Sequence, residues 1–487
     1  MHPQQQLPSS PPAPPSPKSG VTVIIVGGGI GGLSLANMFE RAGISYLILE
    51  KATTIRALGS SLGLDASSLP VMEQLGLLED FYRVSKPVRQ FNFFNEGVKP
   101  IGVVDFSDLE EIGGYPAIIL DRPAFYNVLL KNIPKEKIKY NKRVLSIAQD
   151  EDGATASCSD GSAYLSTIII GADGAYSAVR QNIYKSLKAK GKLSSNDAKP
   201  LGYNQHCLVG VSEPFDPELY PVLKNDYTDF EIVIPKNDPF YAIYMPLPGN
   251  RISWAVIQNV PRADDSSGDS FRFSEWGPHA AQEMADYVRH QPHPLREGGG
   301  GTLGDVIDNT PMDLISKIML EEKFFESWYE ERVVLLGDAC HKVVPSAGLG
   351  ANLAILEGVH LCNLLVDMPS TDQKDITRVF EAYYRQRGRI AKLALGNSRQ
   401  FGKVMGDRGP ISQLVRKIFL NHIPAWMSKQ ANTQRIQYRP QLHFLPPAPT
   451  SAKALVPARP QEARLDWGIR GSIGSESLGG GAKSLPL

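Results

Sequence analysis

The sequence predicts an α/β fold made of a Rossmann-like nucleotide-binding domain, a mixed or antiparallel β-sheet domain and a helical C-terminal region. Residues 21–50 have the pattern of a strand, a glycine-rich turn, a helix and a second strand, which is how a parallel sheet begins. Residues 205–260 contain four alternating strands separated by turns. Residues 376–405 have the apolar periodicity of a long helix.

Length and composition set the broad class of the protein. The 487 residues are enough for two or three domains. Residues 1–20 contain seven prolines and almost no apolar side chains, so we expect a disordered leader that lacks the apolar segment of a secretory signal. No later apolar run is long enough to span a bilayer, and a cytoplasmic protein is therefore expected. The four cysteines are scattered without a CxxC pair, which argues against a disulfide scaffold or a metal site.

The first turn carries a dinucleotide fingerprint. Gly27 permits a sharp turn after the strand, Gly29 leaves room for a pyrophosphate, and Gly32 allows the helix to pack closely on the strand. The amino terminus of the helix then offers free backbone N–H groups to the phosphates. Glu50 ends the second strand, where a carboxylate can accept both hydroxyls of an adenosine ribose. These residues predict a site for an unphosphorylated adenine dinucleotide.

Two later strands also end in an acid. The strand at 166–170 leads into Gly-Ala-Asp-Gly and so places Asp173 and Gly174 at the carboxyl edge of the sheet. The strand at 332–337 ends at Asp338 and is followed by Pro345, Gly348, Gly350 and a helix that begins near Ala351. The amino terminus of that helix can stabilise a second anion. Arg122 begins another helix, where a cation opposes the helix dipole, so we expect it to have an anionic or acceptor partner.

We predict the following organisation from these patterns. The segments are a leader at 1–20, a nucleotide-binding domain at 21–184 whose strands at 88–106 join the other sheet, a β-sheet substrate domain at 200–320, a return to the nucleotide-binding domain at 321–370, a basic helical region at 371–440 and a largely disordered tail at 441–487.

The basic helical region allows two interpretations. Between residues 378 and 439 there are thirteen Lys and Arg residues against two acids. Residues 411–426 form a basic amphipathic stretch, which can lie on an anionic membrane surface or dock on the core of the protein itself. The stretch lacks the interleaved aromatic residues that stack on bases, so no nucleic-acid partner is expected.

Taken together, the motifs resemble those of the flavin-dependent aromatic hydroxylases, also called group A flavoprotein monooxygenases. The nearer resemblance is to fungal FAD-dependent monooxygenases of secondary metabolism, including the paxilline-type epoxidases. Three motifs match in chain order: Gly27, Gly29 and Gly32 with Glu50; Asp173-Gly174 with Ser177 and Arg180; and Gly337-Asp338 with His341, Pro345, Gly348, Gly350 and Asn352.

The resemblance implies FAD as the cofactor and NAD(P)H as a transient co-substrate. Glu50 would bind the ribose, Gly63 would lie in a loop beside the cofactor, and Arg122 would contact it near the pyrophosphate and the ribityl chain. Asp338 would bind the ribityl chain, and Asp173-Gly174 would contact both FAD and the incoming nicotinamide. Ala351 and its neighbours would lie under the isoalloxazine ring.

The implied reaction is hydroxylation or epoxidation of an aromatic or prenylated small molecule by O₂ through a flavin C4a-hydroperoxide. His206 and Tyr241 lie on strands expected to face the substrate and are candidates for the catalytic acid or base, although each also fits a structural role. His341 is expected to shape the loop near the cofactor. The alternatives are a prenyl-chain reductase, a halogenase, and a flavin-binding partner protein without turnover. The stretch at 240–248, FYAIYMPLP, lacks the Trp-rich motif of a halogenase and argues against that alternative.

Overall fold

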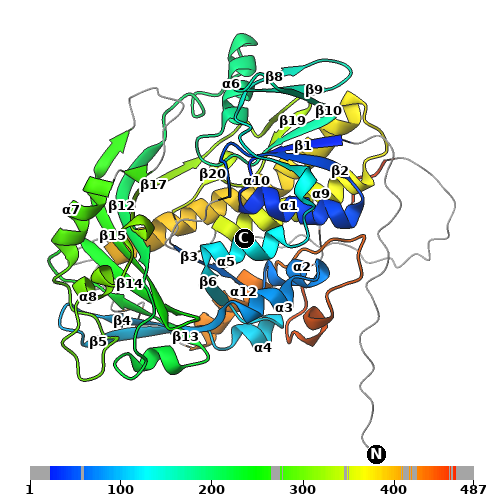
Figure 1. Ribbon diagram of the computed structural model, residues 1–487. Coiled ribbons are helices and arrows are strands. Elements are labelled where there is room, and N and C mark those ends of the chain that lie inside the picture. The colour runs from blue at the N-terminus through cyan, green and yellow to red at the C-terminus, as the bar shows by residue number, and fades with distance from the viewer. Residues whose placement is uncertain are drawn as a thin grey trace, which may run out of the picture.

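The fold of the protein is given by a computed structural model. It describes residues 22–55, 60–264, 275–276, 278–344, 348, 350–406, 409, 416, 418, 420, 425–459, 461 and 464–467. Figure 1 shows a small, mostly parallel sheet with α1 (Ile30–Ala42) and α9 (Gly350–Asp367) on one side of the molecule and a large twisted sheet on the other. The long helix α10 (Gln373–Gly406) runs between them. The predicted α/β fold with a second, mixed β-sheet is confirmed.

The small sheet begins with the predicted strand–turn–helix unit. β1 (Thr22–Val26) pairs in parallel with β2 (Ser45–Leu49) and with β11 (Ile168–Gly171), and the register places Val23 beside Tyr46 and Ile168. The helix α1 ends at Gly43, whose φ of +67° gives the left-handed C-cap that favours glycine. The order of strands is β18 (Tyr329–Glu330), β19 (Val333–Leu335), β11 (Ile168–Gly171), β1 (Thr22–Val26), β2 (Ser45–Leu49) and β7 (Ile138–Lys139).

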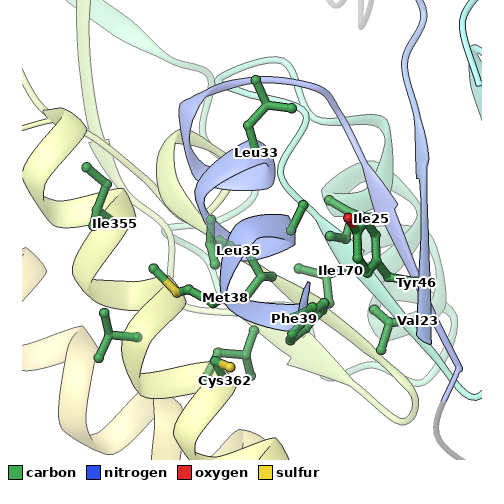
Figure 2. Packing of buried hydrophobic residues seen from close by; sticks show 14 of the residues in the cluster. Val23, Ile25, Leu33, Leu35, Met38, Phe39, Tyr46, Ile170, Ile355 and Cys362 are labelled. Carbon is green, nitrogen blue, oxygen red and sulfur yellow. The ribbon is translucent and has the colours of Figure 1, made fainter. Parts of the chain in front are cut away.

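The helix α1 is buried between this sheet and α9. Figure 2 shows Phe39 on the side of the strand residues and Met38 on the side of α9. The ring of Phe39 lies 6.0 Å from that of Tyr46, and Met38 packs so closely on α9 that a Cβ on Gly358 would lie 3.3 Å from its sulfur. Burial of such side chains stabilises the fold by about 2 kcal/mol each. The packing therefore fixes the glycine-rich turn that precedes α1.

The large sheet combines strands from distant parts of the chain. β4 and β5, which lie in the predicted 88–106 hairpin, join it, and β4 pairs in parallel with β13. Its order is β16 (Glu275–Trp276), β17 (Ser316–Phe324), β12 (Gly202–Val211), β15 (Arg251–Asp264), β14 (Phe240–Leu247), β13 (Thr228–Val233), β4 (Lys86–Phe94), β6 (Ile118–Asp121) and β3 (Ser61–Leu64), with β5 (Pro100–Asp105) beside β4 and β20 (His341–Lys342) beside β17.

The two faces of this sheet have different neighbours. On one face, Phe240, Tyr244 and Trp254 form a cluster with residues of α7 (Pro278–Val288) and α8 (Leu303–Asp308), and we call this the outer face. On the other, Tyr241 and Ile257 form a cluster with residues that lie toward α10, and we call this the inner face. The inner-face cluster also contains Val344, Met405 and Leu420, which do not belong to the sheet.

Shorter elements complete the chain. α6 continues to Ala189, past the predicted domain boundary at 184. The four cysteines are buried and free. The remaining elements are a three-stranded sheet of β8 (Val144–Gln149), β9 (Ala154–Cys158) and β10 (Ala163–Ser166), and the helices α2 (Leu69–Gln74), α3 (Leu78–Arg83), α4 (Leu109–Gly113), α5 (Arg122–Leu130), α6 (Ala178–Ala189) and α12 (Ala425–Ile436).

The C-terminal region corrects one prediction. Residues 441–459, which we expected to be part of a disordered tail, are described and pack on α2 and α4. Gln74 exchanges two hydrogen bonds with the backbone of Leu442, at 2.8 and 3.1 Å, and the amide of Val456 donates to Ile112 O at 3.1 Å. The predicted leader at 1–20 and the tail beyond 467 lie outside the described residues. Among the helices that the structure describes, none combines the length and the apolar character needed to cross a bilayer.

Candidate functional site

The glycine-rich turn has the geometry that the fingerprint predicts. Gly27 has a φ of +107°, and a Cβ on it would lie 2.5 Å from the carbonyl oxygen of Ala172. A Cβ on Gly32 would lie 2.2 Å from the carbonyl oxygen of Gly27, which shows how closely α1 packs on the turn. At Gly29, by contrast, the nearest such atom is 3.8 Å away. The turn is therefore closed at its two ends and open in the middle, where the backbone can approach a ligand.

The amino terminus of α1 is open to an anion. Its N-cap is Gly29, which provides no side-chain hydrogen bond, and the first turn contains no acidic residue. The first backbone N–H groups of the helix are therefore available to a ligand, and the helix dipole favours a negative charge there.

Glu50 lies next to this turn, at the carboxyl end of β2. Its Oε2 accepts a hydrogen bond from Gly28 N at 2.7 Å, and its Oε1 accepts one from Ala52 N at 2.8 Å. Two backbone amides thus fix the carboxylate at the edge of the turn, as a ribose-binding acid requires. Each oxygen retains a lone pair for a ligand hydroxyl.

A cavity of about 480 Å³ opens in front of these residues. Its lining includes Glu50, Asp173 and Gly174. The basic side chains around it are Lys51, Lys142, Arg143 and Lys185. A cavity that combines a helix terminus, a ribose-binding carboxylate and several cations is suited to the adenosine diphosphate part of a dinucleotide.

Asp173 supplies an acceptor to the same cavity. Its Oδ2 accepts hydrogen bonds from Ala178 N at 2.7 Å and Val179 N at 3.2 Å. Its Oδ1 is buried and has no hydrogen-bond partner among the residues that the structure describes. Burial raises the pKa of Asp173, despite the hydrogen bonds that act in the opposite direction. An orphaned buried oxygen at the cavity wall fits a ligand that donates a hydrogen bond.

Asp338 and Arg122 lie near each other but are not among the residues that line this cavity. Asp338 Oδ2 accepts a hydrogen bond from Lys342 Nζ at 2.6 Å. Burial acts to raise the pKa of Asp338, but the charges of Lys342, His341 and Arg122 hold that pKa below its usual value. The Nε of Arg122 is buried and has no hydrogen-bond partner within the described part of the chain. An ionised acceptor and an unused donor therefore stand near each other, as expected for residues that hold a polar chain such as a ribityl group.

Asn352 connects the start of α9 with β3. Its Nδ2 donates to Gly63 O at 3.3 Å and to Gly348 O at 3.5 Å, and its Oδ1 accepts from Asp65 N at 3.4 Å. Gly350 and Ala351 form the first turn of α9 beside it. The predicted residues Gly63, Gly348, Gly350, Ala351 and Asn352 are thus brought together, whereas Pro345 lies outside the described residues.

Gly63 requires a correction. We predicted a loop at this position, but Gly63 lies in β3 and is paired with Ile119 of β6. The Gly- and Ser-rich composition hides the strand, because its partner strand is more than fifty residues away along the chain.

Two buried groups join the motifs, and sequence reasoning missed one of them. Arg180 donates to Ala339 O at 2.9 Å and so ties the segment of Asp173 to that of Asp338. Glu357, which we did not predict, is fully buried in α9, accepts from Gly337 N at 2.7 Å and is hydrogen-bonded to His341 Nε2. A lone acid in the middle of an apolar helix was the signal that could have identified it.

The same segment contains a group of potential metal ligands. Cys340, His341 and Glu357 have ligand atoms within 4.8 Å of one another. Burial and the neighbouring carboxylates raise the pKa of the Cys340 thiol well above its usual value, which disfavours the thiolate that a metal would require. We therefore interpret the group as a hydrogen-bonded anchor of the loop, and His341 lies where a loop-shaping residue is expected.

The two substrate-side candidates lie on opposite faces of the large sheet. Tyr241 is in register with Ile257 and belongs to the inner-face cluster, so it remains a candidate. His206 is in register with Gln258 and, through it, with Phe240, which is an outer-face residue. Because neighbouring positions of a strand point to opposite faces, His206 does not face the same space as Tyr241. The prediction that both residues face the substrate is therefore wrong, since at most one of them can do so.

The basic amphipathic stretch at 411–426 is described at only a few positions. Leu420 is buried in the inner-face cluster, where a Cβ on Gly102 of β5 would lie 2.4 Å from its Cβ. Arg416 is also buried and donates to Met405 O at 3.1 Å. These contacts favour docking of the stretch on the core of the protein.

An ion pair between the buried carboxylate of Asp65 and the partly exposed guanidinium of Arg435 connects α12 to the site. Arg435 donates to Asp65 Oδ2 through Nε at 3.1 Å and Nη2 at 2.7 Å, and the side chain of Asp65 is 4% exposed. Burial acts to raise the pKa of Asp65, but Arg435 and the hydrogen bonds of Ser67 hold it below the usual value. Asp65 follows β3 directly, so the C-terminal region supports the strand that contains Gly63.

We expect Arg435→Met to lower the free energy of unfolding by about 2 kcal/mol, because it leaves the Asp65 carboxylate buried without its partner charge. Chemical denaturation of the two proteins measures the difference. The matched control is Arg83→Met, which removes an ion pair whose arginine is 70% exposed and should cost no more than about 0.5 kcal/mol. Equal losses of unfolding free energy in the two variants would contradict a structural role of the pair between Arg435 and Asp65.

Comparison with known proteins agrees with this geometry. The model of a family described as "FAD binding domain" matches residues 20–211 and 228–398, which is more than half of the chain. The chain is 28% identical over 468 residues to the FAD-dependent monooxygenase atmM of Aspergillus flavus, a match that covers 91% of this chain and 89% of the relative. It is 31% identical over 363 residues to the FAD-dependent monooxygenase paxM of Penicillium paxilli, with 72% and 70% covered.

Solved structures show a similar fold. Klebsiella pneumoniae HpxO, complexed with FAD and uric acid, matches with a TM-score of 0.70 and 18% identity over 86% of this chain and 97% of that chain. CtdE, complexed with FAD and a substrate, matches with a TM-score of 0.65 and 17% identity over 86% of this chain and 97% of that chain.

Proposed function

This chain belongs to the FAD binding domain family and is an FAD-dependent monooxygenase, and we propose that it inserts one oxygen atom into an electron-rich ring or double bond of a lipophilic small molecule. Bound FAD would supply the redox chemistry, taking electrons from NAD(P)H and activating O₂. The proposal concerns the substrate and the residues of this chain that serve it.

The proposed substrate class is based on the apolar inner face of the large sheet. Its centre consists of hydrophobic side chains that are only partly buried and so are available to a ligand: Phe91, Val209, Phe230, Ile243, Ala255 and Ile318. Two ion pairs lie at the ends of the strands, Arg251 with Asp121 at 2.6 Å and Arg399 with Glu322 at 2.9 Å. Since these cations are already paired, the centre of the face favours an uncharged, lipophilic substrate over a carboxylated one.

The inner face lies next to the cofactor residues. Val344, six residues after Asp338, belongs to the inner-face cluster, and Ser61 of β3 contacts Met245 of β14 at 3.4 Å. A substrate on this face would therefore lie close to the flavin end of the site. The apolar surroundings would also keep water away from the reactive oxygen species.

The residues described above fit FAD. Glu50 would bind the ribose and the amino terminus of α1 the pyrophosphate, while Arg122 and Asp338 would hold the ribityl chain. The amino terminus of α9 would stabilise the negative charge of the reduced ring. Tyr241 is the inner-face group that we propose to donate a hydrogen bond to the substrate. For residues 411–426 we propose docking on the protein rather than membrane contact.

Reduction of the flavin in the absence of O₂ tests the substrate class. The purified holoenzyme is mixed with NADPH and with either prenylated indoles and terpenoid alkenes or hydroxybenzoates of similar ring size. We expect at least one lipophilic compound to accelerate flavin bleaching by about tenfold or more, and the carboxylated compounds to have no such effect. Acceleration by the carboxylated compounds alone would refute the proposed substrate class. Transfer of labelled oxygen from O₂ to the product would then confirm monooxygenation.

A further inference from the structure

Tyr176 links the cavity in front of the glycine-rich turn to the large sheet. It lies between Gly174 and the start of α6, and it lines the cavity together with Asp173 and Gly174. Its hydroxyl donates a hydrogen bond to Oε1 of Glu321, which lies on β17 and is 145 residues away along the chain. One side chain therefore contacts both the cofactor cavity and a strand of the large sheet.

The acceptor of this hydrogen bond is buried. Glu321 is only 1% exposed, so its carboxylate depends on donors from the protein and not on water. Loss of a donor to a buried carboxylate costs more than loss of a hydrogen bond between neutral groups. The hydrogen bond therefore fixes the ring of Tyr176 in one orientation at the cavity wall.

β17 also contributes to the inner face. Ile318 and Leu320 belong to the inner-face cluster, and Ile318 is one of its partly buried members. Because neighbouring positions of a strand point to opposite faces, Glu321 points away from the inner face. It lies three positions after Ile318, which is about 10 Å along a strand. A shift of Glu321 would therefore move the strand that presents Ile318.

The segment before Tyr176 leaves room for adjustment at the cavity. Gly174 has a φ of +82°, and a Cβ on it would have no heavy atom of the described residues within 4 Å. The side chain of Tyr176 is itself only half-buried. A ligand that fills the cavity would therefore restrict the ring of Tyr176 further than the protein alone does.

We propose that Tyr176 is a positioning residue that couples the cofactor cavity to the inner face: bound FAD restrains the ring of Tyr176, and the hydrogen bond to Glu321 then holds β17 and its inner-face residue Ile318 in place. The coupling is reciprocal, so a ligand that holds β17 would also strengthen the binding of FAD. Only the link to the substrate rests on the proposed function. The test uses FAD alone, so its outcome is independent of the substrate class.

Hydrogen exchange of the full-length protein, with and without saturating FAD, tests the coupling. In the wild type we expect FAD to slow amide exchange in β17 by about tenfold or more beyond the slowing in β15, which reports the overall stabilisation by a bound ligand. In Tyr176→Phe, which keeps the ring and removes the hydroxyl, FAD should slow exchange in the two strands equally. Equal slowing in the two strands of the wild type would overturn the proposal.

The Kd of FAD, measured by flavin fluorescence, provides a second test. We expect Tyr176→Phe to raise this Kd by about tenfold. Glu321→Gln keeps an oxygen that can accept from Tyr176, so it should raise the Kd by no more than about threefold. The matched control is Tyr115→Phe, which removes a hydroxyl that donates to Glu73 at 2.5 Å. Tyr115 is not among the residues that line the cavity, so this variant should be less stable but should bind FAD as the wild type does.

A double variant shows whether the two residues act through one hydrogen bond. Tyr176→Phe combined with Glu321→Met should raise the Kd of FAD by no more than about tenfold, because the same hydrogen bond is lost only once. It also removes the buried carboxylate, so it takes the place of Tyr176→Phe in both measurements should that variant fail to fold. Losses of affinity that add up in the double variant, or an equal loss in Tyr115→Phe, would overturn the proposal.

Discussion

Protein with Gly27→Ala is expected to be purified without FAD and to be destabilised by about 3 kcal/mol or more. Two physical causes act together. The φ of +107° at Gly27 is strained for any residue with a Cβ, and that Cβ would lie 2.5 Å from the carbonyl oxygen of Ala172 in the neighbouring strand segment. Neither atom can move without separating β1 from β11. The flavin absorbance per protein and the midpoint of thermal unfolding measure the two effects.

The control for this variant is Gly76→Ala. Gly76 lies between α2 and α3 with a φ of +73°, and a Cβ on it would have no heavy atom within 4 Å. The substitution therefore introduces the backbone strain without the clash, and it should cost about 1–2 kcal/mol while FAD remains bound. If Gly27→Ala retained a full complement of FAD and unfolded at the temperature of the control, the proposed role of the turn would be wrong.

The cofactor side of the site could be predicted because its motifs are local. The turn at Gly27 and the acid at Glu50 belong to one strand–helix–strand unit of about thirty residues. Asp173 and Asp338 each follow a buried strand, and the carboxyl ends of parallel strands meet at one edge of a sheet. Knowing that the four strands β1, β2, β11 and β19 are parallel is therefore sufficient to bring the four groups together, without any knowledge of side-chain packing.

The substrate side could not be predicted in the same way, because it depends on register. The face to which His206 points follows from its pairing with Gln258, and β12 has an irregular register between Tyr203 and Gln205. One such irregularity reverses, for every later residue of the strand, the face of the sheet to which its side chain points. The alternation of apolar and polar residues in the sequence identifies the strand. It does not reveal which face of the sheet α7 and α8 cover.

Long-range contacts explain the remaining differences. The composition of 441–459 is typical of a disordered segment, yet the segment is held by partners on α2. Thr450, for example, is hydrogen-bonded through both its amide and its hydroxyl to Glu73, 377 residues away. A sequence pattern within a short stretch of residues does not reveal such long-range contacts.

Replacing Ile243 with aspartate is expected to lower kcat/KM for a lipophilic substrate by about a hundredfold or more, while FAD binding is retained. Ile243 lies on β14 and is a partly buried member of the inner face. A substrate that covers this face would remove water from the new carboxylate, and the loss of that solvation costs several kcal/mol when no partner charge is present. Steady-state kinetics with a compound found to accelerate flavin reduction measures the effect.

Two substitutions at the same position separate charge from shape. Ile243→Val changes the volume by one methylene group and should lower kcat/KM by no more than about threefold. Ile243→Asn introduces polarity without charge and should give an intermediate value, because a neutral amide is less costly to bury than a carboxylate. The flavin content of all three variants should match that of the wild type, since Ile243 does not contribute to the cofactor residues. The aspartate and asparagine variants should unfold at a lower temperature than the valine variant, because Ile243 is partly buried. If the aspartate variant turned over the lipophilic compound at the rate of the valine variant, the substrate would not bind on the inner face.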